Sequence, residues 1–209
     1  MPRGLRRYHE SRQSHFITFS CCRRRPNFVN SAVYDLFPAC LEDMRRRFGM
    51  RIYGYVVMPE HVHLLLSEPE CGTLADAMHY LKLSFTKRLY GLIRAVPQVL
   101  VPVLDANLGT RANLGSGPFW QKRYYDRNVR DAREFTVKLR YLHWNPVKRG
   151  LVKAPGDWKW SSFRHYASRE MGIVEIESEW TGRDRELKKT GGPPRIFLNP
   201  EPALSLSKG

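Results

Sequence analysis

Hydrophobic and polar residues alternate in several short stretches of the chain, and this spacing predicts β-strands. The stretch 15–20 is rich in strand-forming residues, and the stretches 51–57 and 61–67 lie on either side of a tight turn at Pro59. Because successive side chains in a strand point to opposite faces, the last two stretches form a hairpin with one face toward a core. An aromatic run at 119–129 has a similar strand-like character.

Apolar residues recur every three or four positions in three other segments. This period predicts helices at 31–48, at 73–90 and from Asp131 onward. Pro38 lies inside the first of these segments and predicts a kink or a late start. Pro146 is expected to end the third helix or to start the next turn.

The order strand, helix, strand, strand, helix, strand, helix predicts an α+β sandwich, in which a mainly antiparallel sheet has helices packed on one face. We expect this domain to span 15–170, after a basic arm at 1–14. The segment 91–118 contains the sequence Ala-Asn-Leu-Gly twice and reads as an inserted, mobile loop. The segment 171–209 is charged and then rich in proline and glycine, so we expect much of it to be disordered.

Charge adds a functional constraint to this outline. The 209 residues include 35 Lys+Arg against 20 Asp+Glu, a net charge of +15. Such a balance favours an anionic polymer as partner, and nucleic acid before a membrane surface. No apolar run is long enough to span a bilayer, and we expect no membrane partner. The four cysteines form no C-x-x-C pair, which predicts reduced thiols and a cytoplasmic protein.

A histidine pair in the second strand of the hairpin is the first candidate for chemistry. His61 and His63 are two residues apart, so both side chains point to the same face and can form half of a metal site. A two-residue histidine spacing is weak evidence by itself, because the polar face of a half-buried strand often carries such residues.

The helix that follows the last strand supplies a candidate nucleophile. Lys138, Tyr141 and Asn145 share one face of this helix, and the predicted layout brings that face near the histidines. A tyrosine hydroxyl has a pKa of about 10 and becomes a useful nucleophile beside a divalent cation that polarises a phosphodiester. The carbonyl oxygen of Asn145 would be a third ligand, and such a hard ligand suits Mg²⁺ or Mn²⁺. Tyr124 and Tyr125 are rival nucleophiles, for which packing on a strand is the simpler expectation.

Several basic residues are candidates for contact with DNA phosphates, with a solvated surface as the alternative. They are Arg3, Arg6, Arg7, Arg12, Lys82, Lys87, Arg88, Lys122, Arg123, Lys138, Lys148 and Arg149.

Four segments, in this order, resemble the REP-associated tyrosine transposases, which are relatives of the single-tyrosine insertion-sequence transposases. These segments are Tyr-Val-Val-Met-Pro-Glu-His-Val-His at 55–63, Phe-Trp-Gln-Lys-Arg-Tyr-Tyr-Asp at 119–126, Tyr-Leu-His-Trp-Asn-Pro-Val-Lys at 141–148 and Asp-Trp-Lys-Trp-Ser-Ser-Phe at 157–163. The resemblance covers roughly 15–166. It implies a ferredoxin-like fold and metal-dependent cleavage of single-stranded DNA at short palindromic hairpins.

The resemblance also implies roles for individual residues. Tyr141 matches the family nucleophile, which forms a 5′-phosphotyrosine link and leaves a free 3′-hydroxyl. His61 and His63 match the metal ligands, and Asn145 matches the position of the third. The basic arm at the N-terminus and the basic stretch near the C-terminus would hold the hairpin.

Two other functions stay open at this point. A non-catalytic repeat-binding protein would keep the same fold without cleavage. A plasmid-type replication initiator or relaxase would use the same histidine pair, although the small size and the lack of any helicase-like segment count against it. Both a monomer and a homodimer are compatible with the sequence.

Overall fold

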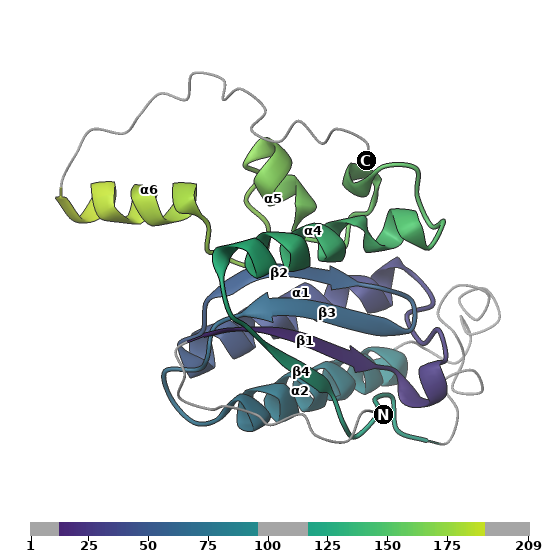
Figure 1. Cartoon of the computed structure of the whole chain (residues 1–209). Helices are drawn as coiled ribbons and strands as arrows, with labels where there is room; N and C mark the ends of the chain where they lie inside the picture. Colours follow the sequence, from purple (N-terminus) through teal and green to yellow (C-terminus); the bar gives the residue numbers. More distant parts are fainter. Residues whose placement is uncertain (1–12, 96–116, 191–209) are drawn as a thin grey trace.

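The chain folds around a four-stranded antiparallel sheet with the strand order β2-β3-β1-β4 (Figure 1). The structure is a computed structural model that describes residues 13–95 and 117–190. The strands are β1 (Ser14–Ser20), β2 (Ile52–Val57), β3 (His61–Leu66) and β4 (Tyr125–Val129). The first three match the predicted stretches closely, whereas only the second half of the aromatic run at 119–129 is a strand.

The helices also follow the predicted periodicity. They are α1 (Ser31–Phe48), α2 (Leu74–Ala95), α4 (Ala132–Lys148), α5 (Phe163–Ser168) and α6 (Glu179–Thr190), with short 3₁₀ turns at Cys22–Arg24 and Pro155–Asp157. The side chain of Asn30 caps α1 by accepting from Val33 N, and Gly49 ends it with a φ of 62°. Helix α1 starts as predicted despite Pro38, and α4 continues for two residues beyond Pro146.

The predicted α+β class with an antiparallel sheet is confirmed, but the helices lie on both faces instead of one (Figure 1). Phe19 of β1 contacts Phe37 of α1, with 6.2 Å between ring centroids. Phe16 points to the opposite face and contacts Tyr141 of α4 at 5.9 Å. The physical reason is that β3 is apolar on both faces, since consecutive residues Leu64 and Leu65 are both fully buried.

A glycine in β2 lets α4 approach the sheet closely. A Cβ atom at Gly54 would lie 2.7 Å from Leu139 Cδ1 of α4, so a larger residue would force the Leu139 side chain to shift. On the other face, Phe85 of α2 and Phe37 of α1 pack 5.9 Å apart and continue the core. Helix α4 is therefore fixed over β2 and β3, the hairpin that carries the histidine pair.

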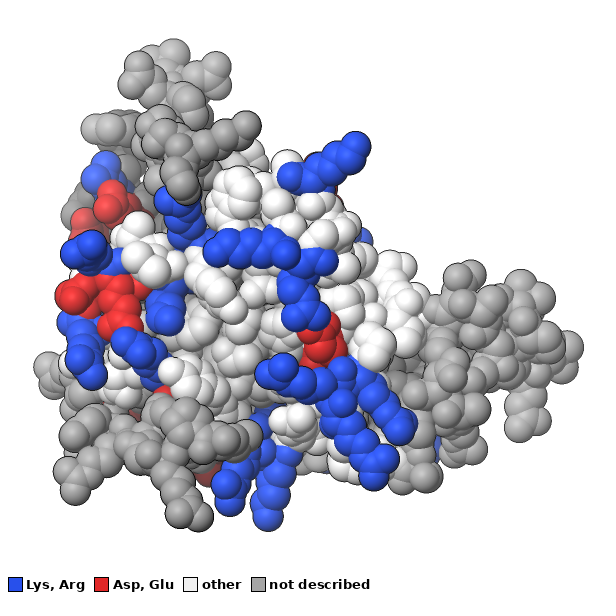
Figure 2. Space-filling model, turned by 45° about the vertical axis from the view of Figure 1, so that its right-hand side comes forward, with Lys and Arg blue, Asp and Glu red and all other residues white. Residues whose placement is uncertain are grey.

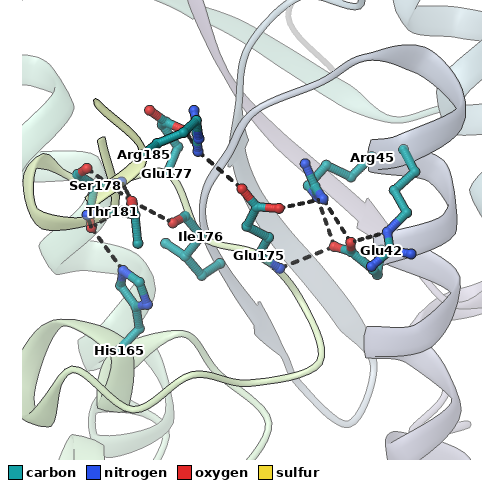
Figure 3. Close-up of polar contacts among 10 residues, drawn as sticks. Glu42, Arg45, His165, Glu175, Ile176, Glu177, Ser178, Thr181 and Arg185 are labelled. Carbon is teal, nitrogen blue, oxygen red and sulfur yellow. Dashed lines mark hydrogen bonds and ion pairs between the residues drawn. The ribbon is translucent and has the colours of Figure 1, made fainter. Parts of the chain in front are cut away.

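Residues beyond the predicted domain boundary at 170 join the same sheet. Val174 and Ile176 are each 3% exposed, and Glu177 N donates to Ile52 O of β2 at 2.7 Å. Figure 3 shows Glu175 held between Arg45 of α1 and Arg185 of α6, at 2.7 and 3.0 Å. The expectation of disorder is therefore wrong for 171–190, and its remainder, 191–209, lies outside the described residues.

The outer edge of β2 is covered by two segments from the C-terminal half of the chain. Val57 N donates to Trp160 O at 2.9 Å, and Ser162 N donates to Tyr55 O at 3.0 Å. The segment that contains Ile176 pairs with Ile52 farther along the same edge. Only the edge of β4 is therefore left without a neighbouring strand in the part of the chain that the structure describes.

Two predicted segments fall largely outside the described residues. Of the basic arm at 1–14, only the last two residues are described, and Ser14 is the first residue of β1. Of the predicted insertion at 91–118, residues 91–95 extend α2, and residues 96–116 are not described. None of the helices within 13–95 and 117–190 has the length and apolar composition that crossing a bilayer requires.

Candidate active site

The two histidines of β3 point toward α4, and their ring nitrogens nearly touch. His61 Nε2 and His63 Nε2 are 3.0 Å apart, and His63 is only 5% exposed. Two nitrogen ligands that are each about 2.1 Å from one ion and at right angles lie about 3 Å apart. The pair therefore has the spacing of neighbouring ligands on a single metal ion.

Asn145 of α4 brings a third polar group to the same point. Its side-chain amide nitrogen is 3.3 Å from His63 Nε2, and the residue is 6% exposed. Its carbonyl oxygen, Oδ1, is buried without a hydrogen-bond partner among the described residues. Because the two ends of an amide have nearly the same shape, a half turn of the group points this oxygen at the histidines.

The candidate metal site combines two imidazoles with a side-chain amide, and it is not built of His, Cys, Asp and Glu alone. Within the described ranges, no three His, Cys, Asp or Glu side chains are arranged to hold a metal ion. A metal ion at His61 and His63 would therefore need the amide of Asn145 as its third donor. The unpartnered oxygen and two neutral imidazoles match what a divalent cation requires.

Two residues that the sequence analysis did not single out orient the histidines. Thr18 Oγ1 of β1 lies 2.7 Å from His63 Nδ1, and Glu60 Oε1 lies 3.1 Å from His61 Nδ1. When a hydroxyl or carboxylate oxygen accepts a hydrogen bond from Nδ1–H, the other ring nitrogen, Nε2, is unprotonated and its lone pair is available to a metal. Arg149 in turn donates to Glu60 Oε1 at 2.6 Å and links the end of α4 to the histidine hairpin.

Burial keeps both imidazoles in the neutral form that a ligand needs. Burial lowers the pKa of His63 to about 3, with smaller effects from His61 and Lys138. The pKa of His61 is also lowered, chiefly by burial, although the carboxylate of Glu60 opposes this shift. Neither histidine has to lose a proton at neutral pH before it binds a cation.

Tyr141 lies at the open side of this cluster, one turn before Asn145. Its side chain is 40% exposed, and its ring packs edge-on against His63 at 5.4 Å. The ammonium group of Lys148 lies 5.7 Å from the Tyr141 ring centroid, and that of Lys138 lies 5.0 Å from the ring of Phe16. The phenol is therefore accessible to a substrate, and two cations flank the approach.

The structure separates the remaining basic candidates into two groups. Lys138 and Lys148 of α4 and Arg149, which directly follows α4, lie beside the histidine cluster, and Lys122 and Arg123 are exposed just before β4. Figure 2 shows that basic side chains are spread over one face of the molecule, whereas acidic ones gather in few places. Such a distribution suits a polyanionic partner.

The candidates on α2 lie away from this cluster, because α2 covers the opposite face of the sheet. Lys82, a candidate for contact with DNA phosphates, is half-buried: it donates to Gln121 O at 3.1 Å, and burial lowers its pKa to about 8. Arg88 is held by Asp43, and Lys87 is exposed. The candidates Arg3, Arg6, Arg7 and Arg12 lie outside the described residues.

Comparisons with known proteins identify relatives of the whole chain. The family model described as "Transposase IS200 like" matches residues 9–99. A provisionally named REP-associated tyrosine transposase of Haemophilus influenzae is 30% identical over 178 residues, which cover 85% of this chain and 92% of that protein. The REP-associated tyrosine transposase of Escherichia coli K12 is 24% identical over 178 residues, covering 85% and 90% of the two chains.

A solved structure shows the same fold. It is a REP-associated tyrosine transposase bound to a REP hairpin, and it matches with a TM-score of 0.60 and 22% identity over 85% of this chain and 93% of that chain. The first of these relatives reaches 30% identity over most of both chains, and the solved structure shares the fold. The chain therefore belongs to the family of REP-associated tyrosine transposases and carries their IS200-like transposase domain.

Proposed function

We propose that this protein is a metal-dependent endonuclease and strand transferase that acts on single-stranded DNA at palindromic hairpin repeats. One observation carries the proposal: the Nε2 atoms of His61 and His63, 3.0 Å apart, meet the amide of Asn145 next to the exposed phenol of Tyr141. A nucleophile beside a cation-binding cluster is the arrangement that phosphodiester chemistry needs.

His61, His63 and Asn145 would hold the divalent cation, which we propose to be Mg²⁺ or Mn²⁺. The unpartnered oxygen of Asn145 supports this assignment, because a buried carbonyl without a partner is costly unless something binds it. When bound, the ion polarises the scissile phosphodiester and stabilises the charge that develops on it.

Tyr141 performs the covalent step in this proposal. Its hydroxyl oxygen attacks the phosphorus and loses its proton to solvent, and the bond from phosphorus to the 3′-oxygen breaks. The 3′-oxygen takes up a proton, so the products are a 5′-phosphotyrosine and a free 3′-hydroxyl. Attack by another 3′-hydroxyl reverses the step and joins the strands. Lys138 and Lys148 attract the phosphate to this position.

The proposed substrate follows from charge and from the related structure. The net charge of +15 favours a polyanion, and the similar solved protein is bound to a REP hairpin. We extend that ligand class to this chain. The main alternative is a protein that binds the same hairpins without cleaving them, and both a monomer and a homodimer fit the proposal.

A covalent-trapping assay tests the proposal. The wild-type protein and its Tyr141→Phe variant are incubated with labelled single-stranded hairpin DNA and Mg²⁺ or Mn²⁺, and the products are separated on a denaturing gel. We expect a metal-dependent protein–DNA band that the variant lacks. A band that survives in the variant would assign the nucleophile elsewhere, first to Tyr124 or Tyr125. Hairpin binding without any band would favour the non-catalytic alternative.

A second variant tests the cluster itself. His63→Ala should abolish the band and keep most of the affinity for DNA, because contacts with phosphates dominate that affinity. Cleavage at the wild-type rate by this variant would refute the assignment of the metal ligands.

A further inference from the structure

An exposed tyrosine lies on the same face of the sheet as the histidine cluster. Tyr125 is the first residue of β4, the edge strand that has no further neighbouring strand within 13–95 and 117–190, and its side chain is 41% exposed. Helix α4 packs over β2 and β3 on this face, so it covers the histidine hairpin at the end of the sheet opposite to β4 (Figure 1).

Cross-strand register connects this tyrosine directly to the metal-binding cluster. Thr18 of β1 pairs with His63 on one side and with Tyr125 on the other. Because directly opposed residues of antiparallel strands share a face, the three side chains form one line across the sheet. Adjacent strands are about 4.8 Å apart, so the line from His63 to Tyr125 is about 10 Å long.

The orientation of the neighbouring residue supports this placement. Asp126 is 3% exposed and points to the opposite face, where it contacts His15 Nδ1 at 2.8 Å. Successive side chains in a strand alternate, so the ring of Tyr125 stands on the side of Thr18 and His63. The antiparallel pairing of β4 with β1 fixes the backbone at this position. The ring can therefore bind a ligand with little loss of conformational freedom.

We propose that the ring of Tyr125 is a stacking platform for one unpaired base of the single-stranded DNA next to the phosphate at the histidine cluster. This inference rests on the proposed function and adds a base contact to it. An aromatic side chain on an open sheet face is a common way to bind unpaired bases. Charge complementarity supports DNA as the occupant, because Lys122 and Arg123 are exposed within three residues of the start of β4 and Lys138 lies over Phe16.

The platform is continuous with the site at which the phosphate would react. Phe16 is the next residue of β1 on this face, and its ring lies 5.4 Å from His63 and 5.9 Å from Tyr141. A DNA strand that places one phosphate beside Tyr141 can therefore extend over β1 toward the edge strand. Stacking of a base requires only the ring of Tyr125. A role of Tyr125 as the nucleophile would require its hydroxyl group.

Fluorescence of 2-aminopurine tests the stacking directly. The base analogue replaces, one at a time, each unpaired base on both sides of the cleavage junction, and binding is measured in a Tyr141→Phe background in which cleavage is blocked. We expect strong quenching at one position. Tyr125→Ala should remove that quenching and raise the Kd about 10-fold to 100-fold. Tyr125→Phe should retain the quenching because it retains the ring.

Two controls isolate the effect of the ring. Tyr90, which is 37% exposed on α2 at the opposite face, provides the matched variant Tyr90→Ala, and its Kd should equal that of the parent. Thermal melting verifies that Tyr125→Ala is folded, and Tyr125→Leu, which keeps an apolar strand residue without an aromatic face, should reproduce its defect. An abasic site at the quenched position should weaken the parent and have no further effect on Tyr125→Ala.

The outcomes separate this inference from the proposed function. Unchanged quenching in Tyr125→Ala at every position, together with a normal covalent band in the trapping assay, would overturn the platform and leave the enzyme intact. Loss of the band in Tyr125→Phe on a wild-type background would make the hydroxyl essential and would also overturn it. Absence of the band in the wild type would overturn the proposed function, while the quenching still reports on the base contact.

Discussion

Replacing Asn145 by leucine keeps the branched shape of the side chain and removes both of its polar atoms. In the absence of a cation, the wild type buries the Oδ1 atom without a partner, which costs about 1–3 kcal/mol. The amide nitrogen contributes a long contact of 3.3 Å to His63 Nε2, for which about 0.5–1 kcal/mol is a reasonable value. The variant should therefore be about 1 kcal/mol more stable than the wild type without metal.

Addition of a cation should reverse this order. A ligand at 100 times its Kd stabilises the folded state by about 2.7 kcal/mol, and this gain requires a competent site. The variant keeps His61 and His63 but lacks the third donor, so we expect it to lose more than half of the metal-induced stabilisation. The same substitution thus improves the stability of the metal-free protein and removes cleavage.

Urea denaturation with EDTA and with Mn²⁺ measures both effects. Asn27 provides a matched control, because it is also 6% exposed but donates to Phe119 O at 3.1 Å. Asn27→Leu should lose about 1–3 kcal/mol under both conditions and keep the full response to Mn²⁺. Our reasoning would be refuted if Asn145→Leu were clearly less stable than the wild type in EDTA, or if it responded to Mn²⁺ like the wild type.

Three further substitutions test other parts of the structure. Thr18→Val removes the hydroxyl that contacts Nδ1 of the buried His63, the proposed metal ligand, and should weaken Mn²⁺ binding about 10-fold to 100-fold in calorimetry. An unchanged Kd would contradict that role of Thr18. Burial lowers the pKa of His143 to about 3, whereas an unfolded chain takes up this proton near pH 6.5. Between pH 6.5 and pH 4, the free energy of unfolding of the wild type should therefore fall by about 1.4 kcal/mol per pH unit because of this histidine, and His143→Gln should lack this loss. Urea denaturation at several pH values measures the difference. The variant His79→Gln, at an exposed position, should follow the wild type. Ile176→Ala should cost about 2–5 kcal/mol, while Ile173→Ala, at a position that is 62% exposed, should cost little; equal losses would show that Ile176 does not anchor its segment.

Periodicity was sufficient for elements that bury a regular apolar stripe. Helix α1 matches the predicted 31–48 at both ends, because Asn30 caps its start and Gly49 ends it in the left-handed conformation. The placement of helices on one face was wrong because the prediction gave β3 a single apolar face. The unbroken run from Leu64 to Leu66 was the available signal that both faces are buried.

The candidate site was predictable where its residues lie close together in sequence. His61 and His63 share a strand, and Tyr141 and Asn145 share a helix face, so local spacing predicted both pairs. Thr18 was missed because cross-strand register determines its position, and a one-residue shift of register would turn it to the other face.

The C-terminal segment shows a different reason for failure. Its buried residues, Val174 and Ile176, are few and lie among charged neighbours, so composition suggested a solvated tail. Their burial depends on an edge of β2 that lies more than 100 residues earlier in the sequence. Patterns within a short window of sequence do not report such a partner.

The covering of the β2 edge also has a consequence during synthesis of the chain. Strands β1, β2 and β3 all lie within the first 66 residues, whereas the segments that cover β2 come from Trp160–Ser162 and from Ile176. A nascent chain, or one truncated before residue 160, would expose this edge and could pair with a second copy. We therefore expect correct folding on the ribosome to depend on how quickly the last quarter of the chain follows.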